Sequence, residues 1–322
     1  MQKSSLENFK KDIHYIREYI EHINLINNVA QENRRSNKES LKNFIKHLSS
    51  FSTEKKIFEY KSIIISLYGI LENTISKWIE EHIQNISYIV KDYNKLDENF
   101  KDNHFNMSIK LISLIIEKKH SKFENINKND ILTNLNSVIQ TSDNFELNSE
   151  AYIPLSGNLK HVKVVEAFKP LDIDLKILEK TTYIDDLVVR RNSIAHGVEI
   201  DNLLGISEFE DFILALEQYM TTIFNIICDK ENKYYFNHND FVYIDQPKEF
   251  FQNNKVCIIN IENIALKIDD TLFIEKNDKF SKVTIIDIQE NGQSVKSAKN
   301  GELGLKLNTT IKKNSKIWKI II

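Results

Sequence analysis

The chain of 322 residues has little of what interrupts helices or holds metals and cross-links. It contains 3 prolines, 7 glycines and 2 cysteines. With so few turn-forming residues, a largely helical body is expected. Cys228 and Cys257 match neither a zinc-ligand spacing nor a disulfide framework. We therefore expect a protein of a reducing cytoplasm, with no metal and no cofactor.

Long apolar runs and a strong excess of one charge are also missing. The most apolar run, residues 62–71, is too short to cross a bilayer and leads directly into Glu72. Residues 1–12 are polar and charged, so no signal peptide is predicted. A formal net charge of -3 means that any contact with nucleic acid must use local basic patches. A globular protein without a membrane partner is expected.

Apolar residues three and four positions apart predict helices through the first two thirds of the chain. Residues 91–105 are polar and are predicted to form a loop, and residues 141–157 are expected to be irregular. Gly197 suits a helix end directly after His196. The predicted helices cover residues 5–30, 39–48, 54–90, 107–116, 129–139, 162–168, 175–179, a motif helix that ends at 196 and is capped by Thr182 or Asp185, and 206–229.

From about Phe241 the pattern changes to short runs rich in Ile, Val, Thr and Phe. Asn291-Gly292 lies between two such runs and is a hairpin signal. Regularly spaced short strands with turn signals predict a small barrel or sandwich. The predicted fold is therefore α+β, with an all-α bundle over residues 1–235 and a small all-β barrel over residues 236–322.

The segment from Arg190 to Gly197 concentrates the side chains suited to chemistry on phosphate. Arg191 offers a planar fork of hydrogen-bond donors that fits phosphate, and His196 can take and return a proton near neutral pH. Asn192 lies four residues before His196, so the two share a helix face. Arg191 and His196 are about 140° apart around a helix. A two-fold dimer would bring two such pairs into one cleft.

The chemistry that such a cleft suits is cleavage of RNA at a phosphodiester. One histidine would remove the proton of a ribose 2′-OH, and that oxygen would attack the adjacent phosphorus. The arginine would stabilise charge on the phosphoryl oxygens. A capped helix with a surface arginine pair and a terminal histidine explains the same pattern without catalysis.

The segment resembles the R-x4-6-H signature of the HEPN superfamily, many members of which are metal-independent RNases. The polar Asn192 directly after the arginine and the Ala-His-Gly ending are usual there. Upstream, residues 67–72 are similar to the Tyr-Ala-x-x-Glu stretch of the RiboL-PSP/MAE-like branch, and residues 156–159 and 185–188 also look like that branch. The resemblance covers about residues 55–230.

The resemblance implies that Arg191 and His196 are the catalytic pair, that Asn192 supports them, and that Glu72, Tyr68 and Arg190 are further candidates. It implies a homodimeric endoribonuclease that leaves a 2′,3′-cyclic phosphate and acts as a toxin or antiphage defence effector on cellular RNA, such as tRNA or ribosomal RNA. Some HEPN domains only dimerise or bind RNA or a nucleotide, so a non-catalytic module is the alternative.

One position departs from the toxin pattern. In some HEPN toxins an antitoxin attaches nucleotide to a tyrosine two residues after the histidine, whereas this chain has Val198 there. That silencing route is therefore not expected here. From the residues alone, Glu72 either has a structural place, facing a crevice or pairing with an arginine, or takes part in the site.

The C-terminal segment resembles the second-domain β-barrel of translation elongation factors, through the runs 283–285, 293–295, 298–307 and 311–319. Asn314 stands at the usual glycine of a Lys-Gly-Asp turn, and asparagine tolerates positive φ. The resemblance implies contact with RNA or docking of a regulatory protein partner. The candidate RNA contacts are Lys312, Lys313, Lys316 and Trp318. A solvated hairpin with a core tryptophan is the alternative.

Overall fold

The computed structural model describes residues 3–33, 38–50, 52–117, 126–140, 145–153, 158–179, 182–198, 202–247 and 249–321. These residues form two compact units. The larger unit lies within residues 1–84, 96–141 and 146–226, and the smaller within residues 85–95, 142–145 and 227–322. Helices followed by an antiparallel sheet confirm the predicted α+β class.

Helices make up the larger unit, and most of them match the apolar periodicity of the sequence. None of the helices in the described ranges has the length and apolarity that a membrane span requires. Their bounds are α1 Lys3–Glu32, α2 Glu39–Ser50, α3 Ser52–Val90, α4 Glu98–Ile116, α5 Lys128–Gln140, α6 His161–Phe168, α7 Thr182–Ala195 and α8 Ile206–Asn237, with short 3-10 helices at Tyr93–Lys95, Ser149–Tyr152 and Lys169–Leu171.

Two local expectations were wrong. Residues 98–105, predicted as loop, are the start of α4, whose buried face includes the polar His104 and Ser108 and so shows little apolar periodicity. Residues 175–179, predicted as helix, form turns, because the Asp174 carboxylate accepts the Lys176 backbone N–H at 2.9 Å and favours a turn over a helix. Residues 141–144 and 154–157 of the segment expected to be irregular lie outside the described residues.

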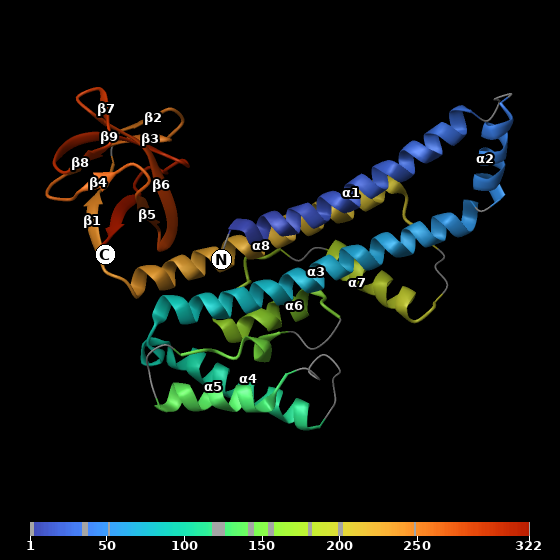
Figure 1. Cartoon of the computed structure of the whole chain (residues 1–322), viewed down its shortest axis with the longest axis horizontal. Coiled ribbons are helices and arrows are strands. Elements are labelled where there is room, and N and C mark those ends of the chain that lie inside the picture. The colour runs from blue at the N-terminus through green and yellow to red at the C-terminus, as the bar shows by residue number, and fades with distance from the viewer. Residues whose placement is uncertain are drawn as a thin grey trace. The chain divides into compact units, whose positions relative to one another are not determined.

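Three long helices, α1, α3 and α8, run side by side in the larger unit (Figure 1). The Trp78 ring lies between Phe9 of α1 and Phe224 of α8, with centroid distances of 6.0 and 5.3 Å. The Arg17 guanidinium of α1 donates hydrogen bonds to Glu210 and Glu217 of α8 at 2.8–2.9 Å. An aromatic core and a bidentate ion pair therefore hold the frame to which α7 attaches.

An antiparallel half-barrel makes up most of the smaller unit. Its main sheet has the order β1-β10-β5-β6-β9-β3-β2, β7 pairs with β6, and β4 pairs with β8. The strands are β1 Phe241–Asp245, β2 Phe250–Phe251, β3 Val256–Ile261, β4 Leu266–Lys267, β5 Thr271–Lys276, β6 Lys279–Glu290, β7 Gln293–Val295, β8 Ser297–Ala298, β9 Gly301–Leu307 and β10 Lys316–Ile320.

Side chains from alternate strand positions fill the half-barrel. Its core is almost wholly aliphatic, and Ile285, Leu303, Leu305 and Ile317 are fully buried within it. At the open side the Asp245 carboxylate accepts the Asn260 backbone N–H at 2.8 Å, which links β1 to β3 where no strand ladder does. The predicted hairpin at Asn291-Gly292 is confirmed, with φ of 50° and 78°.

Candidate active site

Helix α7 carries the motif and is held by its apolar face. Ile184, Leu187 and Val188 are buried, so the opposite face of the helix is free to carry polar groups. Arg191 and Asn192 are half-buried at the boundary between the two faces, and His196 is exposed. The helix therefore presents its polar motif at the surface from a rigid base.

The end of α7 places His196. Gly197 has φ of +68°, the Val198 backbone N–H donates to the Ser193 carbonyl at 3.0 Å, and the Gly197 N–H donates to the Ile194 carbonyl at 3.2 Å. This pair of bonds is a Schellman motif, for which glycine is preferred because the left-handed conformation strains other residues. His196 is thus the C-cap residue, and its own N–H donates to the Asn192 carbonyl at 3.0 Å.

Arg191 and two residues of α3 come together beside the motif. The Arg191 guanidinium lies over the Tyr68 ring, with 4.8 Å from Cζ to the centroid, and its Nη1 donates to the Asn192 side-chain oxygen at 3.1 Å. Glu72 follows Tyr68 by one turn of α3 and is half-buried. The described residues show no ion pair within 4.0 Å between Glu72 and Arg191, so neither group is neutralised directly by the other.

The charges of Glu72 and Arg191 both affect the pKa of Tyr68. Burial raises the pKa of Tyr68, the Glu72 carboxylate raises it further, and the Leu159 backbone and the Arg191 guanidinium oppose the rise. Tyr68 is 2% exposed, and its hydroxyl has no partner within hydrogen-bond geometry among the described residues, the Leu159 backbone included. The phenol therefore stays neutral, with unused hydrogen-bonding capacity beside Glu72 and Arg191.

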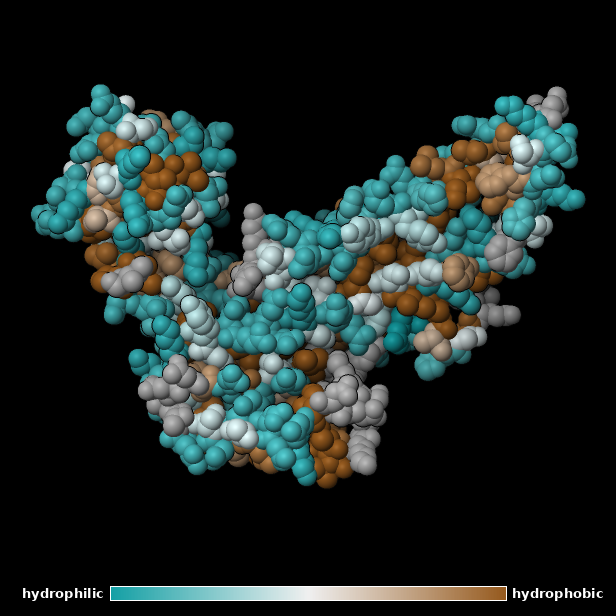
Figure 2. Space-filling view, in the orientation of Figure 1, coloured by the Kyte–Doolittle hydropathy of each residue, from teal (hydrophilic) through white to brown (hydrophobic). Residues whose placement is uncertain are grey.

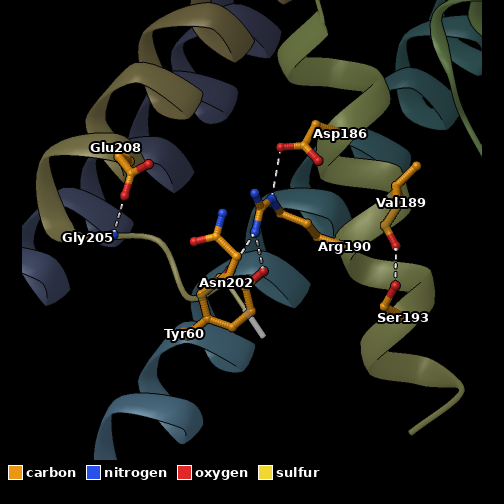
Figure 3. Close-up of polar contacts among 8 residues, drawn as sticks. All are labelled: Tyr60, Asp186, Val189, Arg190, Ser193, Asn202, Gly205 and Glu208. Carbon is orange, nitrogen blue, oxygen red and sulfur yellow. Dashed lines mark hydrogen bonds and ion pairs between the residues drawn. The ribbon is translucent and has the colours of Figure 1, made fainter. Parts of the chain in front are cut away.

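The neighbouring Arg190 is held by Asp186, Tyr60 and Asn202 (Figure 3). Its Nε donates to Asp186 at 2.8 Å, and its Nη1 donates to the Tyr60 hydroxyl at 2.9 Å and to the Asn202 carbonyl at 3.0 Å. Burial lowers the pKa of Arg190, but the hydrogen bonds to Tyr60 and Asp186 outweigh it, so the pKa is raised. Its donors hold α7 to α3 and to the segment before α8.

The structure brings together Arg191, Asn192, Tyr68 and Glu72 of the expected site. It leaves His196 apart, because its side chain makes no hydrogen bond or ion pair with Arg191 or any other described residue. Tyr60 and Asp186, which position Arg190, were not expected from the sequence. Asp186 could have been found from its spacing, since it lies four residues before Arg190 on the same helix.

The candidate RNA contacts of the half-barrel lie in the smaller unit. Lys312 and Lys313 are exposed. Lys316 pairs with Glu275 at 3.2 Å, and the Trp318 indole N–H donates to the same carboxylate at 3.0 Å. The Trp318 ring also packs edge-on against Phe236 and Tyr243. Within the described ranges, no three His, Cys, Asp or Glu side chains are grouped so as to ligate a metal ion.

Residues 32–229 match the family model described as RiboL-PSP-HEPN. The chain belongs to this HEPN family. The match covers more than half of the chain and contains the whole Arg191–His196 segment together with Tyr68 and Glu72. Family membership makes the helical region a nuclease or RNA-binding module of the HEPN type. The half-barrel lies beyond the matched residues, and the chain matches no curated protein.

Proposed function

We propose that this HEPN protein is a metal-independent endoribonuclease whose active site is completed by a second copy of the chain. The observation that carries the proposal is the cluster of Arg191, Asn192, Tyr68 and Glu72, with His196 exposed at the end of α7 and out of contact with Arg191 of the same chain. A guanidinium from one copy of the motif and an accessible imidazole from the other would provide the groups needed for phosphodiester cleavage by an internal hydroxyl.

The proposed reaction needs one base and one acid. The imidazole of one protomer takes the ribose 2′-OH proton while the 2′-oxygen forms its bond to phosphorus, and the bond from phosphorus to the 5′-oxygen breaks. The second protomer's imidazole gives a proton to the leaving 5′-oxygen. The products are a 2′,3′-cyclic phosphate and a 5′-hydroxyl. Arg191 donates to the phosphoryl oxygens as their charge grows.

The separation of Arg191 from His196 supports a site shared by two copies. Exposed apolar side chains flank the motif, with Val189 of α7 46% exposed and Val198, after the end of α7, 54% exposed. On α3, Ile65 is 50% exposed and lies one turn before Gly69, where an added Cβ would meet no atom within 4 Å. Apolar groups in such positions favour an interface, and HEPN domains often dimerise.

A second apolar area lies at the C-terminal end of α1 and the N-terminal end of α3, next to α2. Figure 2 shows apolar side chains at the surface where these helices approach α2. Leu25, Val29, Phe44 and Phe58 are each more than 40% exposed, and α2 buries none of its residues despite its apolar side. An amphipathic helix without a packed face favours association with another chain. We assign this area to the proposed homodimer as well.

In this proposal the two parts of the chain have different roles. Residues 1–235 cleave, and residues 236–322, which resemble the second domain of translation elongation factors, position an RNA such as tRNA or ribosomal RNA or dock a regulatory protein. The biological role is that of a toxin or antiphage defence effector in the cytoplasm. The resemblance of the motif to ribonucleases of that kind supports this role.

The second candidate is a non-catalytic HEPN module that dimerises or binds RNA or a nucleotide and docks a partner through the half-barrel. The observation that favours it is the lack of contact between His196 and Arg191 within one chain. In this case Arg191 grips a phosphate and no bond is broken.

Cleavage of RNA in EDTA separates the two candidates. The wild-type chain should cut RNA in EDTA and leave 2′,3′-cyclic ends, and His196→Ala should lose the activity. His14→Ala is the matched control, because His14 is an exposed histidine on α1, a helix that does not carry the motif. Equal activity of wild type and His196→Ala, or activity abolished by EDTA, contradicts the mechanism. Retained RNA binding without any cleavage supports the non-catalytic module.

A further inference from the structure

The smaller unit has a pocket of about 440 Å³ with a basic rim. Lys276, Lys279 and Lys312 line it, and among the described residues that line it Asp229 is the acidic one. Its apolar lining consists of the buried Ile274, Phe280 and Ile311. The remaining lining groups are amide and hydroxyl side chains. The pocket therefore favours an anion that can accept several hydrogen bonds.

Two tight turns hold the lysines. The turn between β5 and β6 has Asn277 and Asp278 at φ of 52° and 59°, and it places Lys276 opposite Lys279 in the ladder. In the second turn the Ser315 backbone N–H donates to the Lys312 carbonyl at 3.3 Å, and Asn314 has φ of 64°. This is the positive φ that a type II turn requires. Both ends of the cation cluster are thus fixed by backbone geometry.

A hydrogen bond ties the two turns together. The Lys276 ammonium donates to the Lys313 carbonyl at 2.8 Å, and Lys276 is half-buried. Its remaining two donors are available to another acceptor. Lys279 lies 3.7 Å from Asp229, a distance that leaves its ammonium loosely held. Bringing these cations together in the empty protein costs free energy, which a bound anion recovers.

Ser315 adds a directional group to the lining of the pocket. It is 1% exposed and lines the pocket, and its hydroxyl makes no side-chain hydrogen bond with the described residues. The hydroxyl can therefore donate a hydrogen bond to an acceptor atom of a ligand in the pocket.

We propose that this pocket binds a phosphate group of single-stranded RNA, held by Lys276, Lys279, Lys312 and the Ser315 hydroxyl. The proposal rests on RNA being the substrate proposed above and adds a second phosphate contact outside the HEPN motif. Lysine ammonium groups grip phosphate as point charges, and a hydroxyl adds direction. The bound phosphate also attracts Lys279 away from Asp229.

The first test compares two adjacent lysines of one turn. RNA binding is measured by fluorescence anisotropy on the full chain carrying His196→Ala, so that the RNA stays intact. Lys312→Met should weaken binding roughly tenfold at low salt and make the slope of log K against log salt less negative by about 0.7, as expected for one lost single-strand phosphate contact. Lys313 is also a candidate RNA contact from the resemblance to the elongation-factor barrel, but its side chain does not line the pocket. If the pocket rather than that contact holds the phosphate, Lys313→Met should change binding less than about twofold.

Two further variants test the pocket without removing a lysine. Ser315→Ala should weaken binding by roughly threefold, since a neutral hydrogen bond is lost, and should leave the salt slope unchanged. Asp229→Asn should strengthen binding, because it removes the carboxylate that competes with phosphate for Lys279. Circular dichroism and thermal unfolding of each variant confirm that the half-barrel is folded.

The sources of phosphate are separated with three probes. RNA of one sequence is tested with a 5′-phosphate and with a 5′-hydroxyl, and inorganic phosphate is used as a competitor. Tighter binding of the 5′-phosphate RNA assigns the pocket to the 5′ end of the RNA. Equal binding of the two RNAs assigns the pocket to phosphates of the RNA backbone. Equal losses from Lys312→Met and Lys313→Met overturn the pocket and leave the ribonuclease proposal standing, which cleavage in EDTA tests separately. A wild-type chain that binds no RNA overturns both.

Discussion

The guanidinium of Arg191 lies 4.8 Å over the ring of Tyr68, a residue of another helix. Because Tyr68 is buried and α3 is packed on α1 and α8, the ring is a rigid support under a half-buried cation. The Asn192 side chain accepts a hydrogen bond from the same guanidinium at 3.1 Å. The Tyr68 ring and the Asn192 side chain thus orient Arg191 before any substrate binds.

The ring of Tyr68, rather than its hydroxyl, is expected to position Arg191. Tyr68→Phe keeps the ring and should leave RNA cleavage within about twofold of wild type. Tyr68→Leu removes a cation–π contact worth about 1 kcal/mol and should lower kcat/KM about fivefold. Single-turnover cleavage assays measure both. Equal losses in the two variants would instead assign the role to the hydroxyl beside Glu72.

Replacing Arg190 should mainly reduce stability, whereas replacing Arg191 should mainly reduce cleavage. Arg190→Met leaves the Asp186 carboxylate and the Tyr60 hydroxyl without their shared donor and should lower the free energy of unfolding by about 2–3 kcal/mol. Arg191→Met should change that free energy by less than about 1 kcal/mol and abolish cleavage. Urea unfolding and RNA cleavage are measured on both proteins. A stable but inactive Arg190→Met would show that Arg190 acts on the substrate.

Apolar periodicity was enough to predict most of the helices and strands, because their buried faces are made of aliphatic and aromatic residues. It failed at the start of α4, where His104 and Ser108 occupy the buried face. It also missed the hairpin at Asn277–Asp278, since that turn has positive φ at two residues without a glycine. A polar buried face and a glycine-free turn have no clear signal in a single sequence.

The candidate site could be predicted only in part for a similar reason. Arg191, Asn192 and His196 are close along the chain, so one motif contains them. Tyr68 lies far away in sequence, and its place under Arg191 depends on how α3 packs against α7. No spacing rule indicates that packing, and only the resemblance to a family pointed to it. The proposed second copy of the chain has no signature in the sequence beyond the mismatch between Arg191 and His196 around the helix.

The two glycines Gly69 and Gly197 should respond oppositely to alanine. Gly197 has φ of +68°, so Gly197→Ala should cost about 1–2 kcal/mol of stability and displace His196 at the end of α7. Gly69 lies inside α3, where an added Cβ meets no atom of the single chain within 4 Å, so Gly69→Ala should stabilise the monomer by about 0.5–1 kcal/mol. Thermal unfolding measures the stability, and cleavage reports His196. Destabilisation by Gly69→Ala would show that the bare surface there is already covered by a partner.

The buried His104 should make the helical unit sensitive to acid. Its Nε2 accepts the Asn148 backbone N–H at 3.1 Å, and burial lowers the pKa of His104 from 6.5 to about 4. The folded state thus favours the neutral ring, so the stability that His104 contributes is complete above its unfolded pKa and is lost as the pH falls toward its folded pKa. Between about pH 7 and pH 5 the loss should be about 2 kcal/mol.

Urea unfolding at a series of pH values measures this loss. His104→Gln removes the titrating group and should flatten the pH dependence of the unfolding free energy over this range, even if the variant is less stable at neutral pH. His14→Gln is the control, because His14 is exposed and its replacement should leave the dependence as in wild type. If His104→Gln loses as much stability as wild type between about pH 7 and pH 5, another group causes the acid sensitivity.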